Sequence, residues 1–365
     1  MKFARASFLA LSVVTITVAT SSPAIAAPQV GPAVAKKVNA NQPLRDLAQP
    51  HDLAIGSAVD LSALANDPTY RETLATEFDS VTAENVMKWE TLEPQRGEYN
   101  FAPADELIEF AGENEQSVRG HTLVWHNQNP DWLTTGDFSE EELRRILKGH
   151  IQTTVKHFEG KVWQWDVVNE AIGDDGQLRD SIWLRELGPS YIADAFRWAN
   201  EADPKALLYI NDYSVEDINP KSNAYYELVK GLLADGVPID GFGVQGHHSV
   251  NYAPTSMQEN LRRFDDLGLA TAVTEADVRM PMPSDSIKRQ AQANVYSTML
   301  TACVATPRCI SFTVWGFTDK YSWVPSVFVG QGAANIFDES FEPKPAFQAL
   351  QSDLALLDGP RQRKG

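Results

Sequence analysis

Cysteine and basic residues are both scarce in this sequence. Of 365 residues, 2 are Cys, and 31 Lys and Arg residues stand against 49 Asp and Glu residues, which gives a formal net charge of -18. This excess of negative charge repels phosphate backbones and anionic lipid surfaces, so we expect neither nucleic acid nor a membrane as a partner. Hydrophobic residues make up 43% and charged residues 22% of the chain, which excludes a disordered protein and a collagen-like repeat.

Long apolar runs are also scarce, and the longest stands at the N-terminus. Lys2 and Arg5 precede an apolar run over residues 8–19, and the small residues Ala24 and Ala26 follow it. The run is shorter than the roughly 20 apolar residues that a membrane span requires. We therefore interpret residues 1–26 as a secretory signal peptide rather than an anchor, and we expect a secreted, extracellular protein. We also expect a flexible tail over residues 27–44 and a short C-terminal tail over residues 356–365.

The two cysteines, Cys303 and Cys309, are six positions apart. An oxidising compartment favours a disulfide between them, and closing so short a loop stabilises a fold by roughly 2 to 3 kcal/mol. The alternative is a reactive thiol, which needs a neighbour that lowers the pKa of the cysteine. No His or Lys is adjacent to either cysteine in the sequence, so we favour the disulfide.

Short apolar and β-branched runs alternate with helix-like stretches over most of the chain. The expected strands cover residues 53–59, 80–86, 117–124, 162–168, 206–210, 239–244, 270–273 and 310–314, and the clearest helices cover residues 140–158, 190–201, 222–235, 256–267 and 286–302. This alternation implies parallel strands and predicts a single (β/α)8 TIM barrel over residues 45–355. A doubly wound open sheet is the alternative, but residues 56–60 hold one glycine and no dinucleotide-binding fingerprint.

Polar and aromatic residues gather where the expected strands end, which is the edge of a barrel that carries the active site. Two glutamates stand out, because Glu170 follows the fourth strand and Glu275 follows the seventh. Glycoside hydrolysis needs one carboxylic acid that protonates the leaving oxygen and one carboxylate that attacks the sugar or activates water. Either glutamate alone is more typical of a surface or ion-paired residue, but their joint placement predicts a sugar hydrolase.

Two other functions fit part of this pattern. A metal-dependent barrel hydrolase would use several of the seven histidines, but the first strand ends without a His-x-His pair. The adjacent His247 and His248 also face opposite sides of a regular strand, so we expect no metal and no cofactor. A non-catalytic sugar-binding barrel would keep aromatic platforms, but it has no need of two opposed glutamates.

Four runs of the sequence resemble one known family. They are VTAENVMKW at 81–89, GHTLVWH at 120–126, WDVVNEA at 165–171 and WGFTDKYSW at 315–323. As a set, and over residues 45–352, they closely resemble glycoside hydrolase family ten, the endo-1,4-β-xylanases. The resemblance implies a barrel that hydrolyses internal β-1,4-xylosidic bonds of xylan and xylo-oligosaccharides with retention of configuration. We expect such an enzyme to act as a monomer.

The resemblance also implies roles for individual residues. Glu170 would be the acid/base and Glu275 the nucleophile, with His247 and Asp277 holding the nucleophile in place by hydrogen bonds. Tyr213 would lie on the leaving-group side. The other positions that match the family around the substrate are Glu84, Asn85, Lys88, His121, Trp125, Gln128, Asn169, Gln245, Trp315 and Trp323.

Strand geometry adds a condition to these roles. Glu275 and Asp277 are two positions apart and therefore share one side of a strand. Asn169 and Glu170 are adjacent, so both can face a sugar only if the fourth strand ends in a bend or bulge, which we predict.

Three positions depart from the family pattern. Ala276 stands where the family usually has a bulky apolar residue, and Thr271 is more polar than its strand usually is. Asn129 stands where an apolar residue is expected, so the sequence does not determine the local packing at these places. The substrate preference is also open in part. Gln128 and Trp323 would crowd the hydroxymethyl group of a glucose unit, which favours xylan. A β-1,4-glucanase or cellobiohydrolase-like activity is the alternative.

Overall fold

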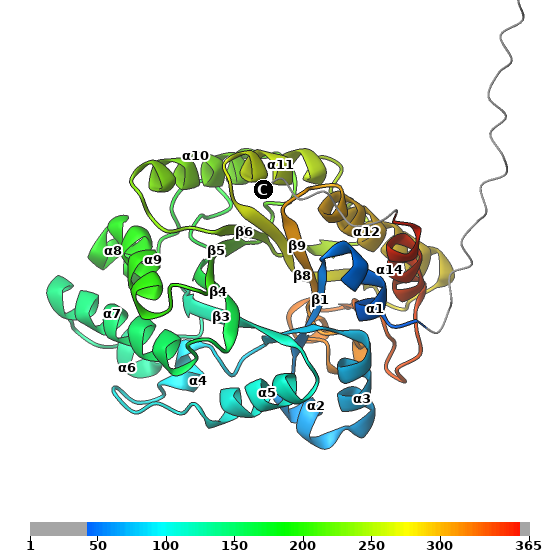
Figure 1. The fold of residues 1–365 in the computed structure, drawn as a ribbon, viewed down its shortest axis with the longest axis horizontal. Helices are drawn as coiled ribbons and strands as arrows, with labels where there is room; N and C mark the ends of the chain where they lie inside the picture. Colours follow the sequence, from blue (N-terminus) through cyan, green and yellow to red (C-terminus); the bar gives the residue numbers. More distant parts are fainter. Residues whose placement is uncertain (1–41, 358–365) are drawn as a thin grey trace, which may run out of the picture. The chain divides into compact units, whose positions relative to one another are not determined.

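Eight parallel strands form a closed barrel inside a ring of helices, which confirms the predicted (β/α)8 fold (Figure 1). The computed structural model describes residues 42–357. The expected signal peptide, most of the tail over residues 27–44 and nearly all of the C-terminal tail lie outside the described residues. The barrel strands are β1 (Ala54–Val59), β2 (Ser80–Ala83), β3 (Ser117–Val124), β4 (Val162–Asn169), β5 (Leu207–Asp212), β6 (Gly241–Val244), β8 (Ala270–Pro281) and β9 (Cys309–Val314).

The barrel closes because its first and last strands pair. Neighbouring strands follow the chain order from β1 to β6, β6 pairs with β8, and β9 pairs in parallel with both β8 and β1. Two short strands, β7 (His247–Ser249) and β10 (Gln331–Gly332), pair with the far end of β8. This end of β8 lies well beyond residue 273, where the sequence predicted that the strand stops. Conversely, β2 ends at Ala83, so Glu84 and Asn85 follow the strand instead of lying within it.

Helices surround the barrel and connect its strands (Figure 1). Their bounds are α1 (Leu44–Ala48), α2 (Leu61–Asn66), α3 (Pro68–Glu77), α4 (Trp89–Leu92), α5 (Ala102–Glu113), α6 (Asp131–Thr134), α7 (Glu140–His157), α8 (Ile182–Leu187), α9 (Ser190–Ala202), α10 (Pro220–Ala234), α11 (Met257–Asp266), α12 (Ser286–Val304), α13 (Val324–Val327) and α14 (Pro345–Leu356), with 3₁₀ turns η1 (Gln49–His51) and η2 (Asp319–Tyr321).

Helix α7 shows how the sequence specifies these elements. The Ser139 side chain caps its N-terminus by accepting a hydrogen bond from the backbone N–H of Glu142. The buried residues Leu143, Leu147 and Ile151 are four positions apart, so they form one apolar stripe facing the barrel. The cap and the stripe together explain why the prediction over residues 140–158 matches α7 closely.

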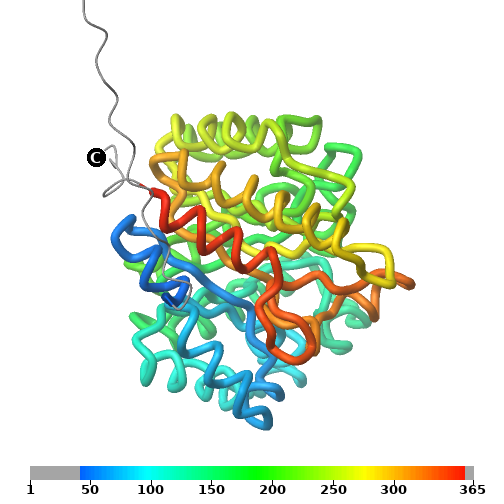
Figure 2. Tube along the Cα trace, turned by 90° about the vertical axis from the view of Figure 1, so that its right-hand side faces the viewer, coloured from blue at the N-terminus to red at the C-terminus, as the bar shows by residue number. Residues whose placement is uncertain are grey.

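The two ends of the described chain meet on the outside of the barrel. Figure 2 shows α14 lying between α1 and α12. The Gln351 side chain donates a hydrogen bond to the backbone oxygen of Gln42 at 2.8 Å. Leu44 is buried in the core, so the fold starts slightly before the predicted boundary at residue 45. Cys303 and Cys309 form the predicted disulfide between α12 and β9.

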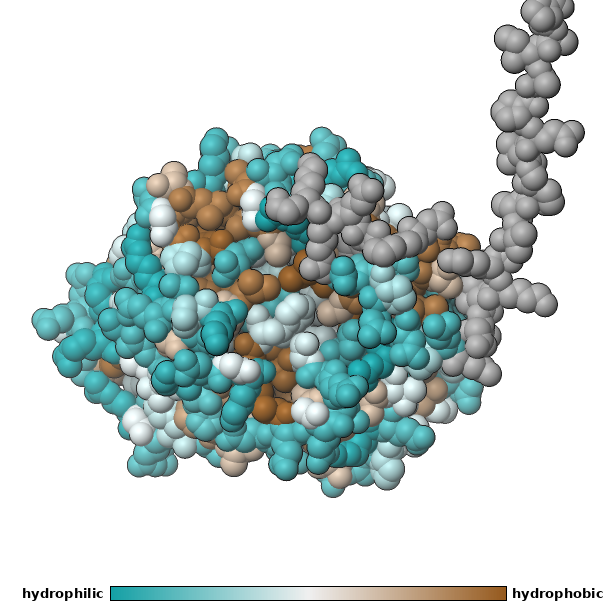
Figure 3. Space-filling view, in the orientation of Figure 1, coloured by the Kyte–Doolittle hydropathy of each residue, from teal (hydrophilic) through white to brown (hydrophobic). Residues whose placement is uncertain are grey.

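The surface seen in Figure 3 is mainly hydrophilic over the outer helices, and hydrophobic residues gather nearer the middle of this face. Within residues 42–357, no helix has both the length and the apolar composition needed to cross a membrane.

Candidate active site

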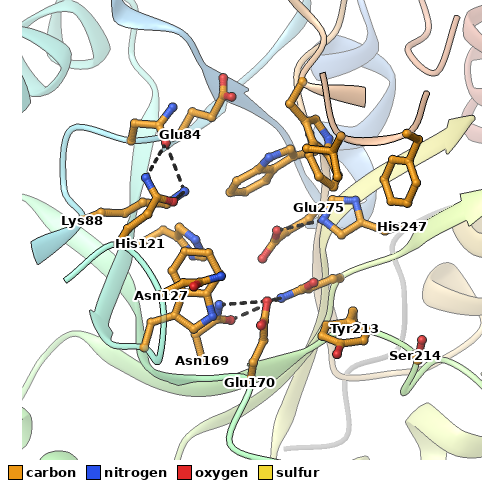
Figure 4. Close-up of a pocket in the computed structure, with 18 of the residues that line it drawn as sticks. Glu84, Lys88, His121, Asn127, Asn169, Glu170, Tyr213, Ser214, His247 and Glu275 are labelled. Atoms are coloured by element: carbon orange, nitrogen blue, oxygen red, sulfur yellow. Dashed lines mark hydrogen bonds and ion pairs between the residues drawn. The ribbon is translucent and has the colours of Figure 1, made fainter. Parts of the chain in front are cut away.

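One cleft collects residues from the final part of the barrel strands and from the segments that follow them (Figure 4). Its volume is about 680 Å³. The predicted residues that line it are Glu84, Asn85, Lys88, His121, Trp125, Gln128, Asn169, Glu170, Tyr213, Gln245, His247, Glu275, Trp315 and Trp323. Of the predicted catalytic, supporting and substrate-binding residues, Asp277 alone does not line the cleft, and it contacts His247, which does.

Five residues that were not predicted from the sequence also line the cleft: Asn127, Ser214, Arg279, Val327 and Phe328. The first two are next to named residues, so a wider window around each motif would have included them. Arg279 is four positions after Glu275 on the part of β8 that the sequence did not predict. Val327 and Phe328 belong to α13 and the residue after it, and nothing in the local sequence marks them as cleft residues.

Glu170 follows β4 at an irregular point of the backbone. The pairing between β4 and β5 shifts its register between Asp166 and Val168, and Glu170 has a left-handed φ of 57°. Its N–H donates a hydrogen bond to the backbone oxygen of Asn211 at 2.8 Å. This irregular strand end confirms the predicted bend, and it turns the adjacent side chains of Asn169 and Glu170 towards the same cleft.

The carboxyl oxygens of Glu170 are in contact with two amides and an imidazole. Gln245 Nε2 donates to Glu170 Oε1 at 3.1 Å, and Asn169 Nδ2 lies 3.5 Å from the same oxygen. His126 Nδ1 lies 3.7 Å from Glu170 Oε2. Burial lowers the pKa of His126, so this imidazole is neutral near pH 7.

Glu275 lies on β8 and points into the cleft towards Glu170 (Figure 4). Its side chain is 5% exposed. Asn211 Nδ2 donates to Glu275 Oε1 at 2.8 Å, and His247 Nε2 lies 3.1 Å from Oε2. Burial alone would raise the pKa of Glu275, but the hydrogen bond from His247 and the charges of His121 and His247 outweigh it and lower the pKa. Glu275 is therefore an ionised carboxylate at neutral pH.

His247 lies between two carboxylates. Its Nε2 faces Glu275, and its Nδ1 lies 3.1 Å from Asp277 Oδ2. Burial opposes the charged imidazolium, but the charge of Asp277 and the contacts with both carboxylates raise the pKa of His247 to about 10. The same Asp277 oxygen accepts a hydrogen bond from Trp323 Nε1 at 2.7 Å. This chain of contacts fixes both the nucleophile candidate and the Trp323 ring.

Asn211 connects the two halves of the site, although none of the sequence motifs contains it. Its Nδ2 donates to Asn169 Oδ1 at 2.9 Å as well as to Glu275, and its Oδ1 accepts from Thr274 Oγ1 at 2.7 Å. Asn211 is completely buried. The available signal was its position at the end of β5, where a strand end in a barrel enters the active-site edge.

The opposite wall is built around Lys88. Its Nζ donates to Gln128 Oε1 at 2.7 Å and to Asn85 Oδ1 at 3.1 Å, and it lies 5.0 Å from the centre of the Trp125 ring. Burial lowers the pKa of Lys88, although several carboxylates around the cleft oppose this shift. Burial and a neighbouring aspartate raise the pKa of Glu84 to about 7, although Lys88 opposes this shift.

His121 is held from the interior of the barrel. Its Nδ1 lies 3.0 Å from Asp166 Oδ2, which also accepts a hydrogen bond from Arg119 Nε at 3.0 Å. Burial would raise the pKa of Asp166, but the charge of Arg119 and the bond with His121 lower it. The ring of His121 meets Trp315 edge to face, with ring centres 5.1 Å apart.

The departures from the family pattern have simple structural outcomes. Ala276 is fully buried, and its backbone oxygen accepts the N–H of Trp315 at 3.0 Å. Thr271 is also buried, and its hydroxyl has no hydrogen-bond partner. Asn129 Nδ2 donates to the backbone oxygen of Trp125 at 3.1 Å, so this polar residue braces a cleft residue. Among residues 42–357, no group of three or more His, Cys, Asp or Glu side chains is arranged to hold a metal ion.

Comparison with known proteins agrees with this geometry. Residues 43–353 match the family described as glycosyl hydrolase family 10. The chain belongs to this family. Endo-1,4-beta-xylanase B of Thermotoga neapolitana is 47% identical to this family 10 chain over 315 residues, which is 85% of the chain and 90% of the relative. An endo-1,4-beta-xylanase of Agaricus bisporus is 43% identical over 296 residues, which is 81% of the chain and 89% of the relative.

Solved structures give the same result for the fold. Xylanase 10B from Thermotoga petrophila RKU-1 in complex with xylobiose has a TM-score of 0.84 and 46% identity, and the match covers 86% of this chain and 97% of that one. A xylanase from Bispora sp. MEY-1 with xylobiose has a TM-score of 0.82 and 36% identity, and covers 85% and 99% of the two chains. These likenesses confirm the family and the fold that the sequence motifs predicted.

Proposed function

We propose that this family 10 protein is an endo-1,4-β-xylanase that cleaves xylan by a retaining, two-glutamate mechanism. The observation that carries the proposal is the pair of glutamates in one cleft with different surroundings. Glu275 is ionised between an imidazolium and an amide, whereas Glu170 meets amide groups and a neutral imidazole. An ionised carboxylate suits a nucleophile, and a carboxyl group without a cationic partner suits a proton donor.

The first chemical step joins the sugar to the enzyme. A carboxylate oxygen of Glu275 attacks the anomeric carbon, and the bond from that carbon to the leaving oxygen breaks while Glu170 gives the oxygen its proton. In the second step, Glu170 takes a proton from water, and the water oxygen attacks the anomeric carbon. The bond from the anomeric carbon to the Glu275 oxygen breaks as the water oxygen attacks, and Glu275 regains its negative charge. Two inversions at one carbon give net retention.

Asn169 and Asn211 suit this mechanism as a linked pair of amides. Asn211 holds one oxygen of Glu275 and also the oxygen of the Asn169 side chain. The Asn169 amide nitrogen is thereby directed into the cleft next to Glu170. A donor in that place can bind a sugar hydroxyl through a hydrogen bond that strengthens as charge develops in the transition state.

The proposed substrate class rests on likeness to relatives and on two fixed side chains of the cleft. The relatives are named endo-1,4-beta-xylanases, and two similar solved structures hold xylobiose. Gln128 and Trp323 both line the cleft, and each is fixed by a hydrogen bond. Fixed side chains discriminate against the additional hydroxymethyl group of a glucan, so we expect xylan to be cleaved in preference to β-1,4-glucan.

NMR of xylo-oligosaccharide cleavage tests both parts of the proposal. We expect the β-anomer to appear first and then to mutarotate, because the mechanism is retaining. An α-anomer as the first product would overturn the mechanism, and turnover of a β-glucan without turnover of xylan would overturn the substrate. Glu275→Ala is expected to abolish cleavage while xylo-oligosaccharide binding by calorimetry persists, as a two-glutamate enzyme requires.

We further propose that the enzyme is secreted and acts as a monomer. The proposal of secretion is supported by the basic, apolar and small-residue segments of residues 1–26. N-terminal sequencing of protein from the culture medium is expected to start at residue 27. Light scattering at working concentration is expected to give the mass of one chain.

A further inference from the structure

Arg179 lies beside the cleft in the segment between β4 and α8, and none of the family motifs contains it. Its Nε donates a hydrogen bond to the backbone oxygen of Glu170 at 2.8 Å. A second nitrogen, Nη2, donates to the backbone oxygen of Ile172 at 3.2 Å and to the Tyr213 hydroxyl at 3.0 Å. One guanidinium group therefore joins the backbone of the proposed acid/base to an aromatic side chain of the cleft.

The backbone at Glu170 needs this support. A residue other than glycine with a φ of 57° is in a sparsely populated conformation, which persists only where the surroundings hold it. The N–H of Glu170 is held by Asn211, and its carbonyl oxygen is held by Arg179. The backbone N–H of Arg179 also donates to the oxygen of Ala171 at 2.8 Å. Arg179 therefore helps to fix the backbone position from which the Glu170 side chain extends.

Tyr213 is the other end of this connection. It follows β5 and lines the cleft, and Lys221 Nζ lies 3.4 Å from the centre of its ring. Lys221 is itself fixed by a 2.8 Å bond to Asp212. The Tyr213 ring is thus held by Lys221 across its face and by Arg179 at its hydroxyl, which leaves little freedom for it to move independently of Glu170.

We propose that Arg179 is a positioning residue that couples the acid/base Glu170 to Tyr213, the residue expected to contact the leaving-group sugar. The proposal rests on the proposed function. When a sugar binds against Tyr213, the same guanidinium group keeps Glu170 aligned with the oxygen that must receive its proton. Proton donation is then tied to occupation of the leaving-group side, since a small misplacement of an acid strongly reduces its effect.

The shape of the guanidinium group is needed for this coupling. Arginine presents several N–H donors in a rigid plane, whereas a lysine ammonium is a point charge on a flexible stem. Arg179→Lys therefore keeps the charge but cannot hold the oxygens of Glu170, Ile172 and Tyr213 in one geometry. A matched control is Arg185→Lys, because Arg185 is an exposed residue that forms an ion pair with Asp180.

Leaving-group dependence tests the proposal. Arg179→Lys and wild type are compared on dinitrophenyl β-xylobioside, whose leaving group needs no proton, and on phenyl β-xylobioside, whose leaving group does. We expect kcat/KM of Arg179→Lys to fall about tenfold or more on the phenyl substrate and to stay within about threefold on the dinitrophenyl substrate. Azide is expected to accelerate turnover of the dinitrophenyl substrate by this variant and to give xylobiosyl azide.

Other outcomes overturn the coupling. Equal losses on both aryl substrates would mean that Arg179 does not act on the acid. A loss confined to xylo-oligosaccharides, seen mainly in KM, would mean that it serves Tyr213 alone. A double-mutant comparison with Tyr213→Phe tests the coupling directly. If Arg179 couples the two residues, the effects of Arg179→Lys and Tyr213→Phe on kcat/KM for xylo-oligosaccharides are expected to be non-additive. Wild type without activity on any xyloside would instead reject the proposed function itself.

Discussion

At the scale of residues, the two glutamates of the proposed mechanism have different surroundings. Glu275 shares a hydrogen bond with a buried amide and lies against an imidazolium. Glu170 is bonded to an amide and faces a neutral imidazole, and its backbone is held from both sides. These different surroundings support the proposed roles of Glu275 as nucleophile and Glu170 as acid/base, which the family resemblance also implies.

His247→Asn tests how the proposed nucleophile, Glu275, is kept ionised. Burial raises the pKa of Glu275 and His247 counteracts this effect, so the variant should have a higher Glu275 pKa. We expect the acidic limb of the kcat/KM profile to move to higher pH and activity at neutral pH to fall about a hundredfold. The measurement is a pH–rate profile on xylo-oligosaccharides. The control His157→Asn changes a half-exposed histidine that pairs with Asp105, and it should keep the wild-type profile.

The same histidine predicts a pH dependence of stability. The charge of Asp277 outweighs burial and raises the pKa of His247 from 6.5 to about 10 in the folded protein. A raised pKa stabilises the fold at low pH, and this contribution is lost as the pH rises from about 6.5 through about 10. Urea titrations across this window should show a steeper fall in the free energy of unfolding for wild type than for His247→Asn. Parallel curves would contradict the charged state of His247.

At the scale of elements, strands with regular patterns were predicted well and short additions were not. Strand β3 has the predicted bounds, and β4 ends one residue later than expected. The bend after β4 was predictable because the adjacent residues Asn169 and Glu170 both had to face the substrate, which a regular strand does not allow. Strands β7 and β10 have three and two residues, so neither is long enough to show a periodicity. They exist because β8 continues past the barrel and offers them an edge.

Gly243→Ala tests how closely β5 and β6 must approach. A side-chain carbon at Gly243 would lie 2.3 Å from Asn211 Oδ1, so Asn211 must shift and loosen its hold on Asn169 and Glu275. We expect kcat to fall about tenfold or more and the free energy of unfolding to fall by about 1 to 3 kcal/mol. Kinetics and urea denaturation measure these effects.

Gly112→Ala is the matched control for this substitution. Gly112 lies near the end of α5, and a side-chain carbon there would meet nothing within 4 Å. Wild-type kcat is expected in this variant, together with equal or slightly higher stability, because alanine favours helix more than glycine does. Wild-type kcat in Gly243→Ala would show that Asn211 need not be held so closely.

At the scale of the whole molecule, closure of the barrel makes distant parts of the chain depend on one another. The last strand pairs with the first, and α14 lies between α1 and α12. The final helix α14 is therefore expected to matter more for stability than for sugar binding.

The net charge of -18 has no counterpart in a neutral polysaccharide, so we assign most of the acidic side chains to solubility.

A pair of leucines in α14 tests the contribution of this helix to stability. Leu350 is 2% exposed and belongs to the core, whereas Leu356 is 62% exposed at the end of the same helix. Leu350→Ala should lower the free energy of unfolding by about 2 to 5 kcal/mol, and Leu356→Ala should change it by no more than about 0.5 kcal/mol. Urea denaturation gives both values. Equal effects would contradict the assignment of α14 to the core.

The sequence by itself determined the barrel and the family, and it predicted the two glutamates, because alternating segments, strand ends and motifs are local patterns that can be followed along the chain. Only the tertiary structure decided that Asn211 bridges Asn169 and Glu275 and that Arg179 joins Glu170 to Tyr213. It also decided that α13 borders the cleft. These contacts depend on how a closed barrel brings separate strands to one edge, and the distances between such residues are set by packing rather than by spacing in the sequence.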